Sequence, residues 1–133
     1  MFEMAKKNWM LALYVIAFLF SQFLLLYGAF ARLDNNALMS KFFSGYKMHF
    51  IAFFFTSLLL FLVLYEINFG FPVLAAFVYS VFVAVAVEYM QKWFTNYRSF
   101  SPYDMLYGIF GAACFLVIGE VISHLADFLK KRS

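Results

Sequence analysis

Hydrophobic residues form four long runs along the chain, and short polar stretches separate them. The runs cover about residues 9–31, 48–65, 71–94 and 103–128. Each run approaches or exceeds the roughly 20 helical residues that cross a hydrocarbon core of about 30 Å. Apolar and polar residues do not alternate within a run, as they do in the strands of a membrane β-barrel. The pattern therefore predicts an all-α, polytopic membrane protein, with residues 1–133 forming a single four-transmembrane-helix bundle.

Composition supports lipid as the solvent for most of the chain. Of its 133 residues, 66% are hydrophobic and only 13% are charged, about half the charged share of a soluble domain. The net charge of +3 comes from basic residues at the ends of the apolar runs, which is typical of a membrane topology signal. We therefore expect membrane lipids as partners and no nucleic acid, while the formation of oligomers stays open.

Four spans place both termini on the same side of the membrane. Basic residues divide equally between the two sides, with Lys6, Lys7, Lys130, Lys131 and Arg132 near the termini and Arg32, Lys41, Lys47, Lys92 and Arg98 opposite. The count of basic residues used by the positive-inside rule is thus equal for the two sides. The count favours cytoplasmic termini if Lys47 or Arg98 is bound in a site and is not a free charge in a loop. A cleaved signal peptide is the alternative for the first run, but that run exceeds the usual apolar length of about 7–15 residues.

Polar residues interrupt the apolar pattern near the ends of three predicted helices. His49 opens the second helix, Glu88 and Gln91 lie in the last turns of the third, Asp104 opens the fourth, and Arg98 precedes it. Since the chain crosses the membrane once between the second and third helices, these residues all fall at one membrane face. An ionisable residue within a span, as Glu88 is, is commonly functional, with structural ion pairing as the alternative. We predict a ligand-binding site made of these five residues.

The residue types limit the chemistry of this site. His49 and Glu88 are the candidates for a general base or a proton relay, and the planar guanidinium of Arg98 suits a phosphate or a carboxylate. Asp104 has a second role available to it, because Ser101 to Asp104 matches the capping pattern of a helix N-terminus. No nucleophile motif accompanies them, so whether the protein is an enzyme stays open.

The sequence predicts no metal site and no cofactor. Glu120, His124 and Asp127 share one helix face by their spacing, but solvation of a helix end explains them without a metal ion. Cys114, the only cysteine, lies in an apolar run and is interpreted as a small buried residue.

Two further features concern helix packing. Gln22, in the middle of the first run, predicts an interhelical hydrogen bond. Gly108, Gly111, Ala112 and Ala113 form a strip of small residues near the start of the fourth helix, which predicts close packing against a neighbour.

Three blocks of sequence resemble the VanZ-like family of small bacterial membrane proteins, named for a member linked to low-level teicoplanin resistance. HFIAFFF (49–55), EYMQ (88–91) and RSFSPYD (98–104) are similar to the family's His-Phe, Glu-x-x-Gln and Arg-x-x-Ser-x-x-Asp blocks. The order and spacing of the blocks agree with the family over roughly half the chain. Two positions depart from it, since Tyr46 stands where the family often has Lys and Gly108 where it commonly has Asn.

The resemblance implies a cell-envelope protein of the bacterial cytoplasmic membrane. Its polar cluster would bind a lipid, a cell-wall intermediate or a lipoglycopeptide at the outer face, and would give low-level teicoplanin resistance. Two alternatives stay open: an intramembrane enzyme that acts on a lipid-linked phosphate substrate, and a structural subunit of a larger membrane complex.

Overall fold

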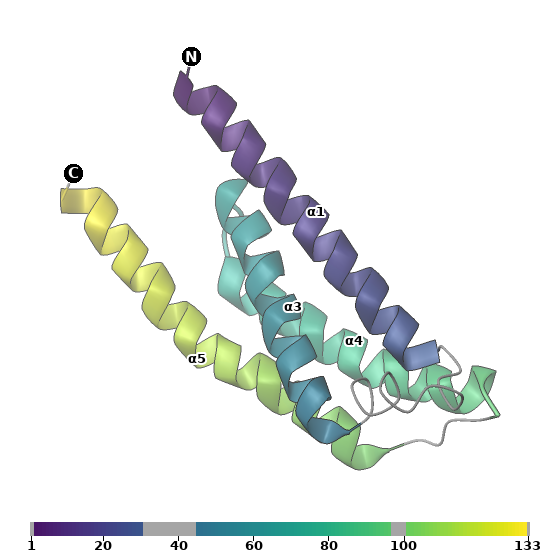
Figure 1. Cartoon of the computed structure of the whole chain (residues 1–133). Helices are drawn as coiled ribbons and strands as arrows, with labels where there is room; N and C mark the ends of the chain where they lie inside the picture. Colours follow the sequence, from purple (N-terminus) through teal and green to yellow (C-terminus); the bar gives the residue numbers. More distant parts are fainter. Residues whose placement is uncertain (1, 31–44, 97–100, 133) are drawn as a thin grey trace.

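The computed structural model describes residues 2–30, 45–96 and 101–132 (Figure 1). In these ranges the chain forms no strand and four α-helices: α1 (Phe2–Phe30), α3 (Tyr46–Glu66), α4 (Pro72–Phe94) and α5 (Pro102–Arg132). All four are long and apolar enough to cross a membrane, which confirms the predicted all-α four-helix membrane bundle. The two termini lie at the same end of the molecule (Figure 1).

The first and last helices extend beyond their apolar runs. α1 begins at Phe2 and already includes Lys6 and Lys7, whereas the apolar run begins only at about residue 9. α5 continues past residue 128 through three basic residues. Lysine and arginine are good helix formers, and cations near a helix C-terminus interact favourably with its dipole. The end of an apolar run therefore does not mark the end of the helix.

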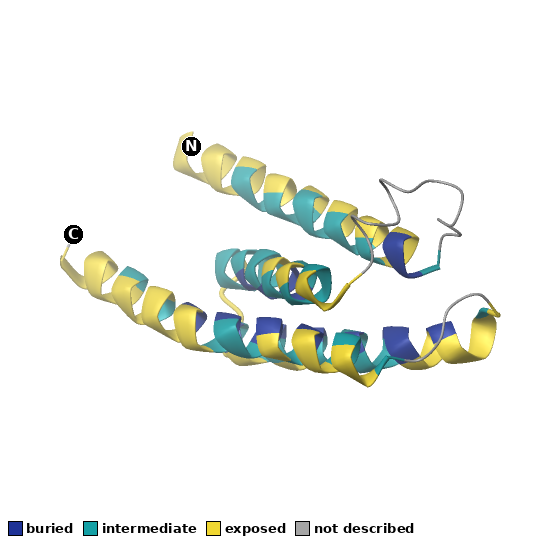
Figure 2. Cartoon of the chain, turned by 60° about the horizontal axis from the view of Figure 1, so that its bottom comes forward, coloured by how far each residue is buried: buried dark blue, intermediate teal, exposed yellow. Residues whose placement is uncertain are grey.

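The helix α3 lies at the centre of the bundle. It packs against α1, α4 and α5, most extensively against α5, whereas α1 makes little contact with α4. Figure 2 shows α1 exposed or half-buried along nearly its whole length, and its buried positions, Gly28 and Ala29, lie close to its C-terminal end. The apolar core is accordingly built from the other three helices, where Phe61 and Phe115 meet with ring centroids 5.8 Å apart.

Side-chain hydrogen bonds join the helices within their apolar spans. The Ser57 hydroxyl of α3 donates to Ser80 of α4 at 2.7 Å, and both side chains are buried. Gln22 of α1 donates to Thr56 of α3 at 3.3 Å and accepts a hydrogen bond from Tyr79 of α4 at 2.8 Å. The predicted interhelical hydrogen bond of Gln22 is thereby confirmed. Such bonds contribute about 0.6 kcal/mol each on average within membranes.

Small residues bring α5 close to α3. Gly108, Gly111 and Ala112 are buried, as expected of the small-residue strip. A methyl group at Gly108 would lie 2.8 Å from the side chain of Phe53, which can rotate. A methyl group at Gly111 would overlap the backbone carbonyl of Phe50, which cannot rotate away. Of these two glycines, Gly111 is therefore the one that lies directly against the backbone of α3.

We expect Gly111→Ala to destabilise the protein, because the added methyl group must push the backbone of α3 away. Overpacking of this kind costs about 1–3 kcal/mol, more than the roughly 1 kcal/mol by which alanine is favoured over glycine inside a helix. Thermal unfolding in detergent, followed by circular dichroism, should show a lower midpoint. Gly70→Ala is the control, because nothing lies within 4 Å of a methyl group there. Equal midpoints for the two variants would contradict the close contact.

Candidate functional site

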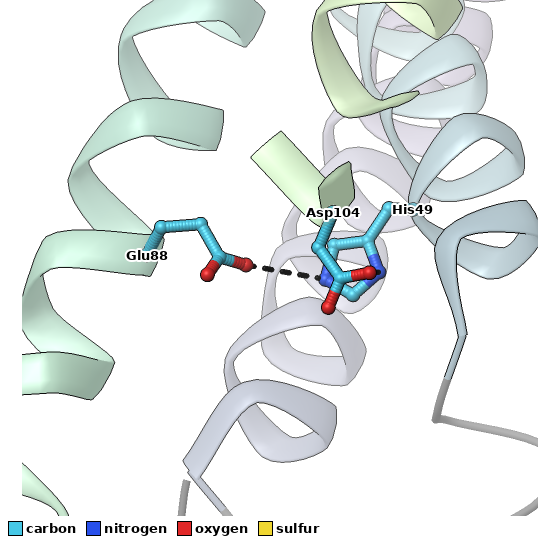
Figure 3. Close-up of side chains that lie close together, drawn as sticks. All are labelled: His49, Glu88 and Asp104. Carbon is cyan, nitrogen blue, oxygen red and sulfur yellow. Dashed lines mark ion pairs between the residues drawn. The ribbon is translucent and has the colours of Figure 1, made fainter. Parts of the chain in front are cut away.

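Three ionisable side chains meet at the end of the bundle where α4 ends and α3 and α5 begin. His49 comes from α3, Glu88 from α4 and Asp104 from α5 (Figure 3). Nε2 of His49 lies 3.6 Å from Oε1 of Glu88, and its Nδ1 lies 3.9 Å from Oδ1 of Asp104. The structure thus brings together three of the five residues that the sequence pattern placed in the site, and we call them the polar cluster.

Glu88 is the most buried member of the polar cluster. Its side chain is 1% exposed, compared with 15% for His49 and 26% for Asp104. Oε2 of Glu88 accepts a hydrogen bond from the backbone N–H of Ser101 at 3.2 Å, while Oε1 faces His49. A carboxylate removed from water is costly unless it is hydrogen-bonded or paired. The Ser101 N–H supplies the hydrogen bond, and His49 supplies the pairing when its imidazole is protonated, so these contacts tie α4 to the starts of α3 and α5.

Ser101 caps α5, in agreement with the capping pattern in the sequence. Its hydroxyl oxygen accepts a hydrogen bond from the backbone N–H of Asp104 at 3.3 Å. In a capping box, the acidic residue at the third helical position bonds in return to the backbone N–H of the cap residue. Here that N–H donates to Glu88 of another helix. The side chain of Asp104 lies beside His49 instead, so Asp104 belongs both to the helix start and to the polar cluster.

The first turn of α3 sets the orientation of the His49 ring. Nδ1 lies 3.1 Å from the carbonyl oxygen of Gly45, and since a carbonyl can only accept, Nδ1 carries a proton. Gly45 precedes α3 with φ of 101°, a conformation that favours glycine. Nε2 is therefore the nitrogen that can exchange a proton, or bind a cation, next to Glu88.

Gln91 lies apart from the polar cluster and attaches α1 to α4. Its side-chain amide donates to the backbone carbonyl of Ala29 at 2.7 Å, and both residues are buried. The last four carbonyls of a helix have no partner within that helix, and Ala29 belongs to the last turn of α1. Gln91 satisfies one of these carbonyls. The structure gives Gln91 this contact with α1, and its predicted part in ligand binding stays a prediction.

The other polar residues that the sequence singled out lie elsewhere. Arg98 falls outside the described residues. Toward the far end of α5, Nε2 of His124 lies 3.5 Å from Oε2 of Glu120, and these side chains are 82% and 53% exposed. Such exposure agrees with the interpretation of that group as a solvated helix end.

An apolar cavity of about 200 Å³ borders the polar cluster. Its wall is formed by residues 21–29 of α1, residues 48–55 of α3 and Val87 of α4, and its polar side chains are Ser21 and His49. His49 belongs both to this wall and to the polar cluster, so the cavity and the polar cluster adjoin. The sequence did not predict this cavity, because a run of apolar residues looks the same whether it lines a cavity or fills a core.

Comparison with known proteins leaves the family open. No family model, curated protein or solved structure matches the chain. The resemblance to the VanZ-like family therefore stays a prediction, and the function is argued from the geometry of the site.

Proposed function

We propose that the protein binds an amphiphilic lipid, either a phospholipid or a lipid-linked cell-envelope intermediate, with its chain in the cavity and its headgroup at the polar cluster. The observation that carries the proposal is the position of His49, which lines the apolar cavity and also contacts Glu88. An apolar space that ends at a polar group matches the two parts of a lipid. An apolar cavity of about 150 Å³ holds benzene, so this cavity accommodates a short segment of an acyl chain.

The polar cluster supplies the headgroup contacts. Imidazole and carboxylate groups form hydrogen bonds with hydroxyl and ammonium groups, which are common in phospholipid and sugar headgroups. Arg98 enters the proposal on sequence grounds alone. It stands three residues before Ser101, and its guanidinium suits the phosphate of such a lipid.

The second candidate function is an enzyme that acts on a lipid-linked phosphate. The 3.6 Å between Nε2 of His49 and Oε1 of Glu88 favours it, because a carboxylate and an imidazole this close can relay a proton in general acid–base catalysis. Binding ranks first because the apolar cavity accounts for it directly: lipid chains from the membrane can fill this cavity, and no chemical step has to be assumed.

We infer that the protein resides in the bacterial cytoplasmic membrane, with both termini in the cytoplasm and the polar cluster at the outer face. The resemblance of three sequence blocks to the VanZ-like family supports location in the bacterial cytoplasmic membrane. The basic residues near the start of α1 and at the end of α5 support cytoplasmic termini. The two membrane faces carry equal numbers of basic residues. The proposed orientation therefore assumes that Arg98 binds the ligand and does not count as a free charge in the positive-inside rule.

Filling the cavity should prevent lipid binding. Ala52 lines the cavity, and Ala52→Phe places a ring in it. We expect native mass spectrometry of the purified protein to show at least about a tenfold loss of retained phospholipid, since the ring takes the space of the acyl chain. Val78→Phe is the control, because Val78 is 57% exposed on α4 outside the cavity. Equal lipid retention by the two variants would refute the proposal, and lipid turnover that Glu88→Gln abolishes would favour the enzyme.

Removing the charge of Glu88 should abolish teicoplanin resistance in cells that gain it from this protein. Glu88→Gln keeps an oxygen that can accept the Ser101 N–H but loses the negative charge facing His49. We expect the minimal inhibitory concentration to fall to that of cells without the protein, at an unchanged amount of protein in the membrane. Glu120→Gln is the control, because that carboxylate is exposed and remote from the polar cluster. If Glu88→Gln is missing from the membrane, the polar cluster is structural.

Cysteine labelling checks the orientation. Asn96 is exposed just beyond α4, so Asn96→Cys in a Cys114→Ser background should react with an impermeant maleimide added to intact cells. Arg132→Cys, at the exposed end of α5, should react only after the cells are made permeable. The reverse pattern would place the termini outside.

A further inference from the structure

We propose that His49, Glu88 and Asp104 form a site for one divalent transition-metal ion, for which Zn²⁺ is the probe. One potential ligand atom of each residue lies within 4.8 Å of the other two, and no other such group of three occurs among the described residues. Figure 3 shows the two carboxylates beside the imidazole, each coming from a different helix. Imidazole nitrogen and carboxylate oxygen are ligands that zinc takes in proteins.

The spacing between His49 and Glu88 suits an ion between them. Nε2 and Oε1 are 3.6 Å apart, which exceeds the roughly 2.7–3.2 Å of a direct N–H···O hydrogen bond. Two ligand atoms that each lie about 2.0–2.1 Å from a tetrahedral zinc ion are about 3.4 Å apart. The observed separation is therefore closer to that of two ligands of one metal ion than to that of a hydrogen-bonded pair.

Backbone groups hold both of these ligands in the required orientation. Histidines that bind metal ions usually donate their other ring N–H to a carbonyl or carboxylate, and Nδ1 of His49 donates to Gly45 in this way. A bound metal ion takes the place of any proton on Nε2, whose lone pair faces Glu88. The N–H of Ser101 in turn holds Oε2 of Glu88 and leaves Oε1 on the side of His49. The two ligands are thus oriented by contacts that do not involve the metal ion.

Asp104 supplies the third ligand. Its Oδ1 lies 3.9 Å from Nδ1 of His49, and one of its carboxylate oxygens lies within 4.8 Å of the ligand atoms of His49 and Glu88. Its side chain is 26% exposed, so it occupies the outer side of the site. The ligand atoms of a tetrahedral zinc ion lie about 3.4 Å apart, so binding must draw the most widely separated pair, within 4.8 Å here, together by up to about 1.4 Å. Rotation of the carboxylate side chain provides such a movement. Three protein ligands leave one position of a tetrahedral ion open for water or for an oxygen of another molecule.

Zinc binding by the full chain tests the proposal. The protein is purified in detergent without a histidine tag and titrated with Zn²⁺, and its bound metal is measured by elemental mass spectrometry. We expect one zinc ion per chain and a rise in the thermal midpoint on adding zinc. His49→Ala and Glu88→Gln should each weaken binding by more than about 100-fold, because loss of an outer partner of a ligand alone costs about 10–100-fold.

Two controls separate zinc binding at this site from zinc binding at the surface and from lipid binding. His124→Ala removes the exposed histidine that lies near Glu120 and should keep wild-type zinc affinity. Ala52→Phe leaves all three ligands in place, so zinc affinity should persist even where lipid retention is lost, which makes this inference independent of the proposed lipid binding.

The midpoints of His49→Ala and Glu88→Gln without zinc show whether these variants fold. If either variant does not fold, Asp104→Asn, which keeps the backbone cap of α5, replaces it in the comparison. Two results would overturn the proposal: wild-type protein that binds no zinc, or folded His49→Ala and Glu88→Gln variants that bind zinc as tightly as the wild type. The polar cluster would then be an ion pair only.

Discussion

The carboxylate of Glu88 is almost completely buried, and the helices at this end of the bundle are placed so that it has polar partners. An acidic residue at the centre of a membrane span costs about 2.5–3.5 kcal/mol, and less toward the interface. A hydrogen bond to a charged group contributes about 1.5–3 kcal/mol, so the Ser101 N–H offsets much of that cost, and His49 adds an ion pair at 3.6 Å when its imidazole is protonated. Both contacts exist only when α3 and α5 begin beside the last turns of α4. One buried charge thereby sets the relative position of three helices.

The helix α1 depends on a different set of contacts. Lipid is as apolar as the helix surfaces, so apolar burial does not drive α1 against its neighbours in a membrane. Polar bonds hold it at two levels, through Gln22 to Thr56 and Tyr79, and through the carbonyl of Ala29 to Gln91. The cavity lies along residues 21–29 of α1, the stretch between these two attachments. Because α1 is held at both ends of this stretch, the space beside it need not be filled by protein side chains.

Hydrophobic patterning predicts the helices well because the membrane fixes their length and leaves the backbone no other structure. Topology also predicts that His49, Glu88 and Asp104 share one end of the bundle. What the pattern cannot predict is the partner of each side chain, since that depends on helix rotation and on backbone groups. Gln91 shares a helix face with Glu88 by its spacing of three, yet its partner is a carbonyl of α1. The cavity is a property of packing between helices, and no single run of residues encodes it.

Burial separates the roles of the three clustered residues. Glu88 is 1% exposed, so a molecule that arrives from the cavity or from water meets His49 and Asp104 before it. His49 is the residue that faces both the cavity and the polar cluster. A bound lipid would therefore contact His49 first, and Glu88 lies behind it, where it can exchange a proton with Nε2 of His49. A metal ion would follow the same order, because Glu88 would be its most buried ligand, backbone groups of Ser101 and Gly45 would orient Glu88 and His49, and the open coordination position would lie on the exposed side. The most buried residue thus organises the site, and the half-exposed residues meet what binds there.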